Sequence, residues 1–202
     1  MTLSKLKFNL KLAAALVSVV SAGAYISMHG SSNQISSPEV AQVRPDASPW
    51  DAILMSTTGL GDPDPAVVIF FDPACPHCAE LNEELKKSPM PLRVKWVPVA
   101  VMSAKSVELA TNILASSDPL TAFEANEAAV KEGSTSTLLP PVVDASVSKA
   151  KADVRANTAA FTALNQDSIP TIVTVDKSGK LIIQTGAVPL DAFLSIYGKF
   201  KA

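Results

Sequence analysis

Two cysteines separated by two residues come shortly after a strongly apolar run, and this arrangement constrains the fold more than any other feature. Residues 66–71 have the sequence AVVIFF, a continuous run typical of a strand that is buried on both faces. A short Asp-Pro-Ala connection leads to Cys75, and Cys78 follows three positions later. Pro76 suits the first turn of a helix, where its missing N–H has no partner to lose. The pattern therefore predicts a buried strand, a turn and a helix that begins at the first cysteine.

The spacing of the cysteines favours redox chemistry over a structural disulfide. A disulfide contributes most to stability when it closes a long loop, and this one would enclose only Pro76 and His77. Thiol–disulfide exchange needs one sulfur that is a thiolate near neutral pH and a second sulfur nearby. Unpaired N–H groups at a helix N-terminus favour the thiolate of Cys75, and the adjacent imidazole can stabilise it. We predict catalytic roles for Cys75, Cys78 and His77, with a Cys75–Cys78 disulfide in the oxidised protein and Cys78 more buried.

A metal site is the alternative for this cysteine pair. Structural zinc needs four ligands, and the chain has no further cysteine and only one other histidine, His29. A dithiol that carries copper(I) is chemically possible. We predict that the protein uses neither a metal nor a cofactor.

Apolar periodicity and turn residues outline the elements that flank these cysteines. A short helix or edge strand is expected at 50–57, and a second strand at 92–102. Pro98 within that second strand suggests an edge position or a bulge. The chain ends with a predicted hairpin of strands at 171–175 and 180–185, followed by one more expected element. That element is a closing helix at 189–200.

A block of helices is predicted between the second strand and the hairpin, in an insert at about 103–166. Its three segments are 106–115, 119–132 and 145–165. Asp118 and Pro119 form a cap and first turn, and Gly133 ends the middle helix. In the first segment Val107, Ala110, Ile113 and Leu114 are expected on one apolar face.

Ile169 and Pro170 directly precede the first hairpin strand. A proline in this position is a candidate for a cis peptide bond. The whole order is strand, dithiol, helix, strand, helical block, hairpin and helix. It predicts an α/β thioredoxin fold in a domain at 49–202. A helical insertion separates the dithiol helix and the second strand from the hairpin that follows Pro170.

The chain resembles the catalytic domain of the periplasmic disulfide isomerase family, DsbC and DsbG, and is closer to DsbG. The resemblance runs from about Val67 to Gly198 and depends on three motifs. These are Phe71-Asp72-Pro73-Ala74-Cys75-Pro76-His77-Cys78, the run ATNILASSDP at 110–119, and Ile169-Pro170-Thr171. The resemblance implies that Cys75 is the nucleophile, Cys78 the resolving thiol and Pro170 a cis proline opposite the dithiol. It also implies that Pro76, Ile169 and Pro170 support the site and that the backbone beside Pro170 pairs with substrate.

Several residues depart from that family. The residues before the domain leave no room for the isomerases' dimerisation domain, so we expect a monomer. The dipeptide Pro76-His77 is similar to that of DsbA, an oxidase, and Ile169 stands where the DsbG-like pattern has Thr. The acid buried behind the dithiol in thioredoxins and DsbA has no counterpart in 67–71. Asp72 is interpreted as a turn residue near the surface rather than a proton relay.

The N-terminus has the layout of a secretory signal. Three lysines in the first eleven residues precede an uncharged stretch at 12–28, and Ala22-Gly23-Ala24 is a candidate cleavage site. We predict a signal peptide at 1–24, with an uncleaved anchor to about residue 28 as the alternative. A flexible tether at 25–48 follows, because this stretch lacks apolar periodicity. The expected location is the periplasm.

The composition limits the kinds of partner that the protein is expected to bind. The chain has 202 residues, 17 basic and 19 acidic, with no long run of either sign, so we expect no nucleic-acid binding. The predicted activity is thiol–disulfide exchange on client proteins that contain cysteines or disulfides. A DsbD-like or DsbB-like membrane protein is the expected redox partner. The alternatives are a DsbA-like dithiol oxidase, and a chaperone or assembly factor dedicated to one secretion or conjugation system.

Overall fold

The computed structural model describes residues 47–134 and 145–200. The chain divides into two units, Met1–Ala41 and Gln42–Ala202, and every described element belongs to the second. The predicted signal peptide and almost all of the predicted tether lie outside the described residues. Within the described part, no helix combines the length and the apolar character needed to cross a bilayer.

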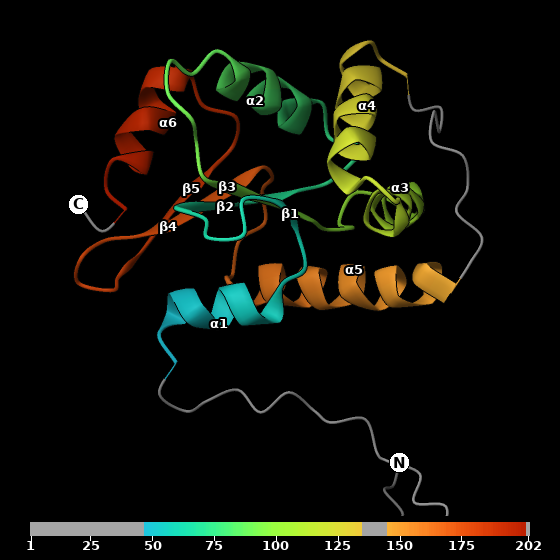
Figure 1. The fold of residues 1–202 in the computed structure, drawn as a ribbon, viewed down its shortest axis with the longest axis horizontal. Coiled ribbons are helices and arrows are strands. Elements are labelled where there is room, and N and C mark those ends of the chain that lie inside the picture. The colour runs from blue at the N-terminus through green and yellow to red at the C-terminus, as the bar shows by residue number, and fades with distance from the viewer. Residues whose placement is uncertain (1–46, 135–144, 201–202) are drawn as a thin grey trace, which may run out of the picture. The chain divides into compact units, whose positions relative to one another are not determined.

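A five-stranded mixed sheet forms the centre of the second unit, with its strands in the order β1-β3-β2-β4-β5 (Figure 1). Only β2 and β3 pair in parallel, and the other neighbours are antiparallel. All five residues of β2 and all five of β4 are buried, as expected for strands with neighbours on both sides, and β2 has a continuous apolar sequence. The strands are β1 Leu60–Gly61, β2 Val67–Phe71, β3 Val94–Pro98, β4 Thr171–Val175 and β5 Leu181–Thr185.

Six described helices cover the two faces of the sheet (Figure 1). Helices α2, α4 and α6 lie on one face, α1 and α5 lie on the other, and α3 packs against both α4 and α5. The helices are α1 Pro49–Ser56, α2 Pro76–Lys86, α3 Ala104–Ala115, α4 Pro119–Lys131, α5 Ala145–Ala163 and α6 Leu190–Tyr197. The chain therefore has the predicted thioredoxin fold, with α3, α4 and α5 inserted between β3 and the hairpin.

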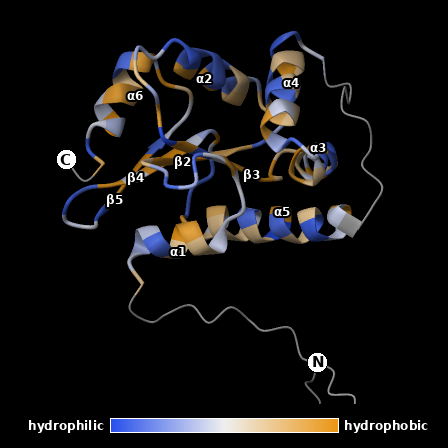
Figure 2. Cartoon of the chain, viewed as in Figure 1, coloured by the Kyte–Doolittle hydropathy of each residue, from blue (hydrophilic) through white to orange (hydrophobic). Residues whose placement is uncertain are grey.

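The core has two parts, one on each side of the sheet, and alternate residues of β2 contribute to each. Figure 2 shows the strands as predominantly apolar, whereas the helices carry polar residues on their outer sides. Successive side chains of a strand point to opposite faces, which explains why β2 has no polar residue. On one face the buried residues include Val67, Ile69, Phe71, Leu81, Phe123 and Phe193. On the other they include Trp50, Val68, Phe70, Val97, Phe161 and Val173.

The second strand is shorter than predicted and does not lie at the edge of the sheet. β3 lies between β1 and β2, and Pro98 is its last residue, paired with Phe71. The short β1 runs beside Lys95 and Trp96 only, so a proline at the end of β3 displaces no ladder bond on that side. Asn157 of α5 donates a hydrogen bond to the Pro98 carbonyl at 2.9 Å.

β1 is not predicted by the sequence, because two residues are too few to show any periodicity. Gly61 adopts a φ of +100°, and a Cβ there would collide with the carbonyl of Val94. Glycine is therefore needed at this position for both its conformation and its close approach to β3.

The inserted helices follow the predicted start and stop signals. Asp118 accepts a hydrogen bond from the Thr121 N–H at 3.1 Å, and Gly133 has a φ of +72° just beyond α4. The expected apolar face of α3 is partly wrong. Ala110 and Ile113 are buried, but Val107 is 41% exposed because the buried side of α3 is centred on Leu109 and Ile113.

Candidate active site

The turn between β2 and α2 places Cys75 at a helix N-terminus. Asp72 Oδ1 accepts a hydrogen bond from the Ala74 N–H at 2.9 Å, and the Cys75 N–H donates to the Asp72 carbonyl at 2.9 Å. Cys75 is the N-cap of α2 and Pro76 is its first helical residue. The predicted strand, turn and helix are confirmed.

Both cysteines are buried free thiols in this structure. Cys75 is 4% exposed and Cys78 is fully buried, so Cys78 is the more buried of the two, as predicted. The Cys78 N–H donates to the Cys75 carbonyl at 3.1 Å. The outer sulfur, Cys75 Sγ, lies 4.0 Å from the carbonyl oxygen of Ile169.

The pKa of Cys75 is lowered from 9.0 to about 6. The largest cause is a hydrogen bond from the Cys78 thiol, which stabilises the thiolate and outweighs the opposing effect of burial. The backbone N–H groups of Cys78 and His77 also lower this pKa, and the charge of the His77 imidazole is the smallest named cause. A sulfur with this pKa is largely a thiolate at neutral pH.

The pKa of Cys78 moves in the opposite direction and is raised well above 9.0. Burial is the largest cause, followed by the hydrogen bond to Cys75 and the repulsion from its thiolate. The site therefore contains one acidic thiol and one thiol that holds its proton tightly, an arrangement that suits stepwise disulfide exchange.

His77 is exposed and interacts mainly with a carboxylate. Its Nδ1 lies 2.8 Å from Glu80 Oε2, and 69% of its side-chain surface is accessible. The hydrogen bond to Glu80 is the main reason why the pKa of His77 is raised, and the Cys75 thiolate adds a smaller upward effect. The interaction with Glu80 therefore favours the protonated imidazole, which faces solvent beside the dithiol.

The segment before β4 lies against the dithiol, as expected. The Ile169–Pro170 peptide bond is cis. The Pro170 carbonyl accepts a hydrogen bond from the Gly186 N–H at 2.8 Å, which ties this segment to the end of β5. The structure thus brings Cys75 together with Ile169 from a region far along the chain.

The expectation that Asp72 lies near the surface is wrong. Its side chain is fully buried, and its Oδ2 accepts hydrogen bonds from the N–H groups of Val101 and Met102 at 2.8 and 3.0 Å. The predicted turn interaction is also present, through Ala74. Asp72 therefore ties the loop after β3 to the turn that carries Cys75.

A second buried acid, Glu127 of α4, was not identified from the sequence. It is 2% exposed, and its pKa is raised from 4.5 to about 8, first by burial and further by the charge of the Cys75 thiolate. Spacing gave a signal, because Phe123, Glu127 and Val130 are four and three positions apart and share the buried side of the helix. A carboxyl group in such a series is unusual in a core.

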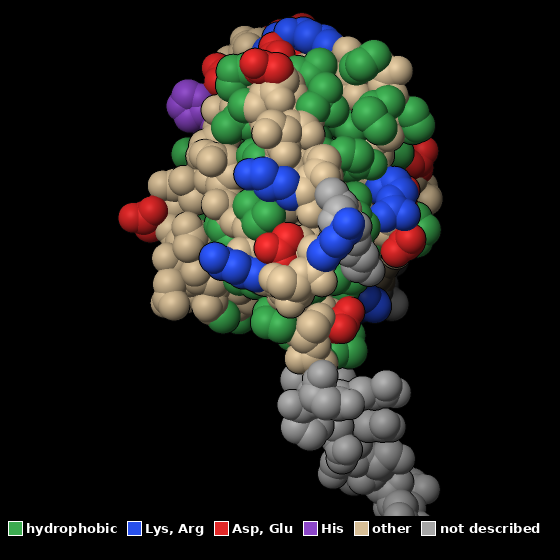
Figure 3. Space-filling model, turned by 90° about the vertical axis from the view of Figure 1, so that its left-hand side faces the viewer, with side chains coloured by type: hydrophobic (Ala, Val, Ile, Leu, Met, Phe, Trp, Pro, Cys, Tyr) green, Lys and Arg blue, Asp and Glu red, His purple; other side chains and the backbone are tan. Residues whose placement is uncertain are grey.

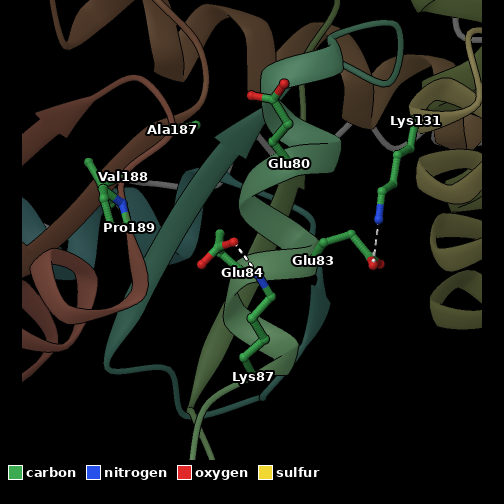
Figure 4. Close-up of a pocket in the computed structure, with 8 residues that line it drawn as sticks. All are labelled: Glu80, Glu83, Glu84, Lys87, Lys131, Ala187, Val188 and Pro189. Atoms are coloured by element: carbon green, nitrogen blue, oxygen red, sulfur yellow. Dashed lines mark hydrogen bonds and ion pairs between the residues drawn. The ribbon is translucent and has the colours of Figure 1, made fainter.

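A surface pocket of about 490 Å³ lies along α2 but contains neither cysteine (Figure 4). Figure 4 shows Glu83 paired with Lys131 of α4, and Glu84 paired with Lys87. Glu80 connects the pocket to the dithiol, since it also binds His77. The lining residues are Glu80, Glu83, Glu84, Lys87, Lys131, Ala187, Val188 and Pro189.

Potential metal ligands are sparse around the dithiol. Across residues 47–134 and 145–200, no group of three or more His, Cys, Asp or Glu side chains is arranged to hold an ion. The copper(I) alternative would therefore involve the two sulfurs themselves, as soft ligands.

Comparison with known proteins identifies the family. The family model described as a thioredoxin-like domain matches residues 56–201. A structure of Proteus mirabilis ScsC in a compact conformation is 17% identical, with a TM-score of 0.52 over 74% of this chain and 75% of the other. The thiol-disulfide exchange protein alpha-DsbA2 of Wolbachia pipientis is 14% identical, with a TM-score of 0.52 over 74% and 90%. No curated protein matches the chain. At these identities the solved structures support the fold alone. The closer resemblance to DsbG stays a prediction. The family match shows that the chain belongs to the thioredoxin-like domain family.

Proposed function

We propose that this protein is a thiol–disulfide oxidoreductase that acts on client proteins through Cys75 and Cys78. The observation that carries the proposal is the opposite displacement of the two pKa values. The pKa of Cys75 is lowered to about 6, whereas that of the fully buried Cys78 is raised well above 9.0. One sulfur is thereby prepared to attack and the other is held back until a mixed disulfide has formed.

Reduction of a client disulfide proceeds in two exchanges. The Cys75 thiolate attacks one client sulfur, a Cys75–client disulfide forms, and the other client sulfur leaves as a thiolate. Cys78 then loses its proton and attacks Cys75 Sγ, so that the Cys75–Cys78 disulfide forms and the client leaves as a second thiolate. Two electrons pass from the protein to the client. The reverse sequence forms a client disulfide.

The low pKa of Cys75 favours the direction in which the protein oxidises its clients and is itself reduced. A thiolate that is stabilised in the folded protein makes the reduced form more stable and the disulfide a stronger oxidant. Known proteins of this chemistry range from about −270 mV for thioredoxin to about −120 mV for DsbA. We propose a potential toward the oxidising end, which supports the DsbA-like alternative over an isomerase.

The location and partners belong to the same proposal. The predicted signal sequence supports export to the periplasm, where disulfides persist. A DsbB-like membrane oxidant would regenerate the disulfide of a monomeric oxidase, and a DsbD-like reductant would serve an isomerase or reductase. Acidic and basic side chains are both scattered over the face shown in Figure 3, which suits varied protein clients better than a polyanion.

A trapping experiment tests the activity. The variant Cys78→Ala cannot resolve a mixed disulfide, so clients should accumulate on Cys75 and be released by a reductant. Cys75→Ala, with Cys78 intact, is the matched control and should capture nothing. Many trapped clients support a general catalyst, and a single client indicates a dedicated assembly factor. Absence of any mixed disulfide would refute the proposal.

The direction of transfer has its own measurement. Alkylation of the cysteines in cells, followed by a mobility shift, reports the resting redox state. A mostly oxidised Cys75–Cys78 pair is expected for an oxidase. A mostly reduced pair would instead identify an isomerase or a reductase.

A further inference from the structure

The sheet has one long open edge, which is strand β5. The two edge strands are β1, with two residues, and β5, with five. All five residues of β5 are half-buried, whereas all five residues of its neighbour β4 are buried. Within the described part of the chain, no helix or strand other than β4 packs extensively against β5. An edge strand of this length offers its backbone N–H and C=O groups to any chain that pairs with it.

Hydrogen bonds at the two ends of the β4–β5 pair decide which groups of β5 face outward. The Gly186 N–H donates to the Pro170 carbonyl at 2.8 Å, and the Asp176 N–H donates to the Lys180 carbonyl at 3.1 Å. Because bonded residues alternate along an antiparallel pair, the even-numbered residues of β5 bond to β4. The residues whose N–H and C=O groups point away from the sheet are therefore Leu181, Ile183 and Thr185.

The outward groups of β5 remain available for pairing. Among the described residues, the N–H groups of Leu181, Ile183 and Thr185 have no backbone hydrogen-bond partner. The Thr185 carbonyl accepts a hydrogen bond from the Gln184 side chain at 2.8 Å, and a carbonyl oxygen has a second lone pair. A partner strand can therefore satisfy every outward group of β5.

β5 lacks the features by which edge strands avoid pairing with other chains. Those features are charged side chains, prolines, bulges and very short strands. The sequence of β5 is LIIQT, without a charge or a proline. Its register with β4 is continuous from Leu181 to Thr185, so it contains no bulge. The opposite edge is protected by the shortness of β1, and β5 has no equivalent protection.

The outward groups are symmetric about Ile183, so two copies of β5 complement each other. In an antiparallel pair centred on Ile183, this residue faces its own counterpart and Leu181 faces Thr185. Each of these three residue pairs exchanges two N–H···O bonds. No two charges face each other, because β5 carries none and Lys180 would face Gly186. Such a self-complementary surface has the property that a two-fold symmetric dimer requires.

We propose that β5 is a self-association surface, to which a second copy of this chain adds its own β5 in antiparallel orientation. The two sheets then form one continuous sheet. A single pair of short strands is a smaller interface than the about 1,200–2,000 Å² of stable complexes, so the dimer is reversible. The monomer expected from the lack of room for a dimerisation domain is accordingly the form at low concentration.

This pairing does not involve the dithiol. β2 and β5 run in the same direction, because each is antiparallel to β4. The two β5 strands of a dimer run in opposite directions, which places the two Cys75 residues at opposite ends of the joined sheet. The inference therefore stands independently of the proposed function.

Sedimentation of the full-length protein tests the pairing, in excess reductant so that no intermolecular disulfide forms. The mass of the wild type should rise from monomer toward dimer between micromolar and millimolar concentrations. Ile183→Pro removes an N–H that is not bonded to β4, which an edge strand tolerates, and should stay monomeric throughout. Ile183→Thr keeps the N–H and the branched side chain and should dimerise like the wild type. A wild type that is monomeric at every concentration would overturn the inference, and so would undiminished dimerisation of Ile183→Pro.

Amide hydrogen exchange provides a measurement that needs no variant. The outward N–H groups of Leu181, Ile183 and Thr185 should exchange rapidly in dilute wild-type protein and become protected at high concentration. The N–H groups of Ile182 and Gln184 should be protected at both concentrations, because they bond to β4. Rapid exchange of the outward groups at both concentrations would overturn the inference even if Ile183→Pro failed to fold. Protection at both concentrations would show a different occupant of this edge and would overturn it as well.

Discussion

At the scale of single residues, the ionisation of Cys75 depends mainly on a hydrogen bond from Cys78. Cys75 is a thiolate at neutral pH mainly because the Cys78 thiol donates a hydrogen bond to it, with help from two backbone N–H groups. His77 adjoins the nucleophile in sequence, yet its side chain pairs with Glu80 at the surface. The residue that lowers the pKa of the nucleophile most is therefore its own resolving partner.

The first prediction concerns the pKa of Cys75. The rate of its alkylation by iodoacetamide should rise with pH about a midpoint near 6. Cys78→Ala should move that midpoint toward 9, because the largest stabilising hydrogen bond is lost, whereas Cys78→Ser keeps a donor and should shift it less. His77→Ala should cause a smaller change than Cys78→Ala. A larger effect for His77→Ala would reverse the assigned order of causes.

The second prediction concerns His77 and its carboxylate. Glu80→Gln should lower the pKa of His77, because Glu80 is the main cause of its upward shift. The histidine pKa can be followed by NMR titration of the ring protons. Glu84→Gln, one turn further along α2, is the control and should leave that titration nearly unchanged. An unchanged pKa of His77 in Glu80→Gln would contradict the pairing.

At the scale of elements, the inserted helix α4 closes one side of the dithiol. It contributes Phe123 to the core beneath the site and Asn126 to the turn before Cys75. It also contributes the buried carboxyl of Glu127. The insertion therefore forms part of the environment of Cys75 and Cys78.

The third prediction tests the connection between α4 and the dithiol turn. Asn126→Ala removes the donor to both Pro73 and Glu127, leaving two buried acceptors without a partner. The free energy of unfolding should fall by about 1–3 kcal/mol, measured by urea denaturation of the reduced protein. Lys131→Ala, which removes an exposed ion pair on the same helix, should change it by less than about 1 kcal/mol. Equal urea midpoints for Asn126→Ala and the wild type would refute the connection.

At the scale of the whole molecule, two buried ionisable groups impose opposite pH dependence on stability. The folded pKa of Cys75 is depressed from 9.0 to about 6, so the reduced protein gains stability as the pH rises through that range. The folded pKa of Glu127 is raised from 4.5 to about 8, so the protein loses stability as the pH rises through that range. Between about pH 6 and 8 the two effects oppose each other.

The fourth prediction separates these contributions. Urea denaturation of the reduced protein should show Glu127→Gln becoming progressively more stable than the wild type between about pH 4.5 and 8. In that variant the stability should rise from about pH 6 to 9, through Cys75, by at most about 1.4 kcal/mol per pH unit. Parallel curves for the two proteins would show that Glu127 is not titrated on folding.

The sequence predicted the parts of the site that depend on neighbouring residues. An apolar run without polar interruption indicated β2, and the proline after Cys75 indicated a helix start, because both signals act over a few residues. The β-branched strand after Pro170 was equally local. Burial of Asp72 could not be predicted in this way, since it is covered by the loop after β3. For Glu127 the helical spacing gave a local signal of burial, but it did not show that α4 packs against the dithiol helix.

The sequence by itself determined the dithiol, its helix N-terminus, and the hairpin that follows Pro170, because turn chemistry and periodicity are local properties. Only the tertiary structure decided which groups surround the two sulfurs. Packing of α4 against α2 places the Glu127 carboxyl where it and the dithiol affect each other's protonation, and the loop after β3 buries Asp72. The pKa values that govern the chemistry depend on burial and on charges near in space. Those quantities exist only once distant segments have packed together.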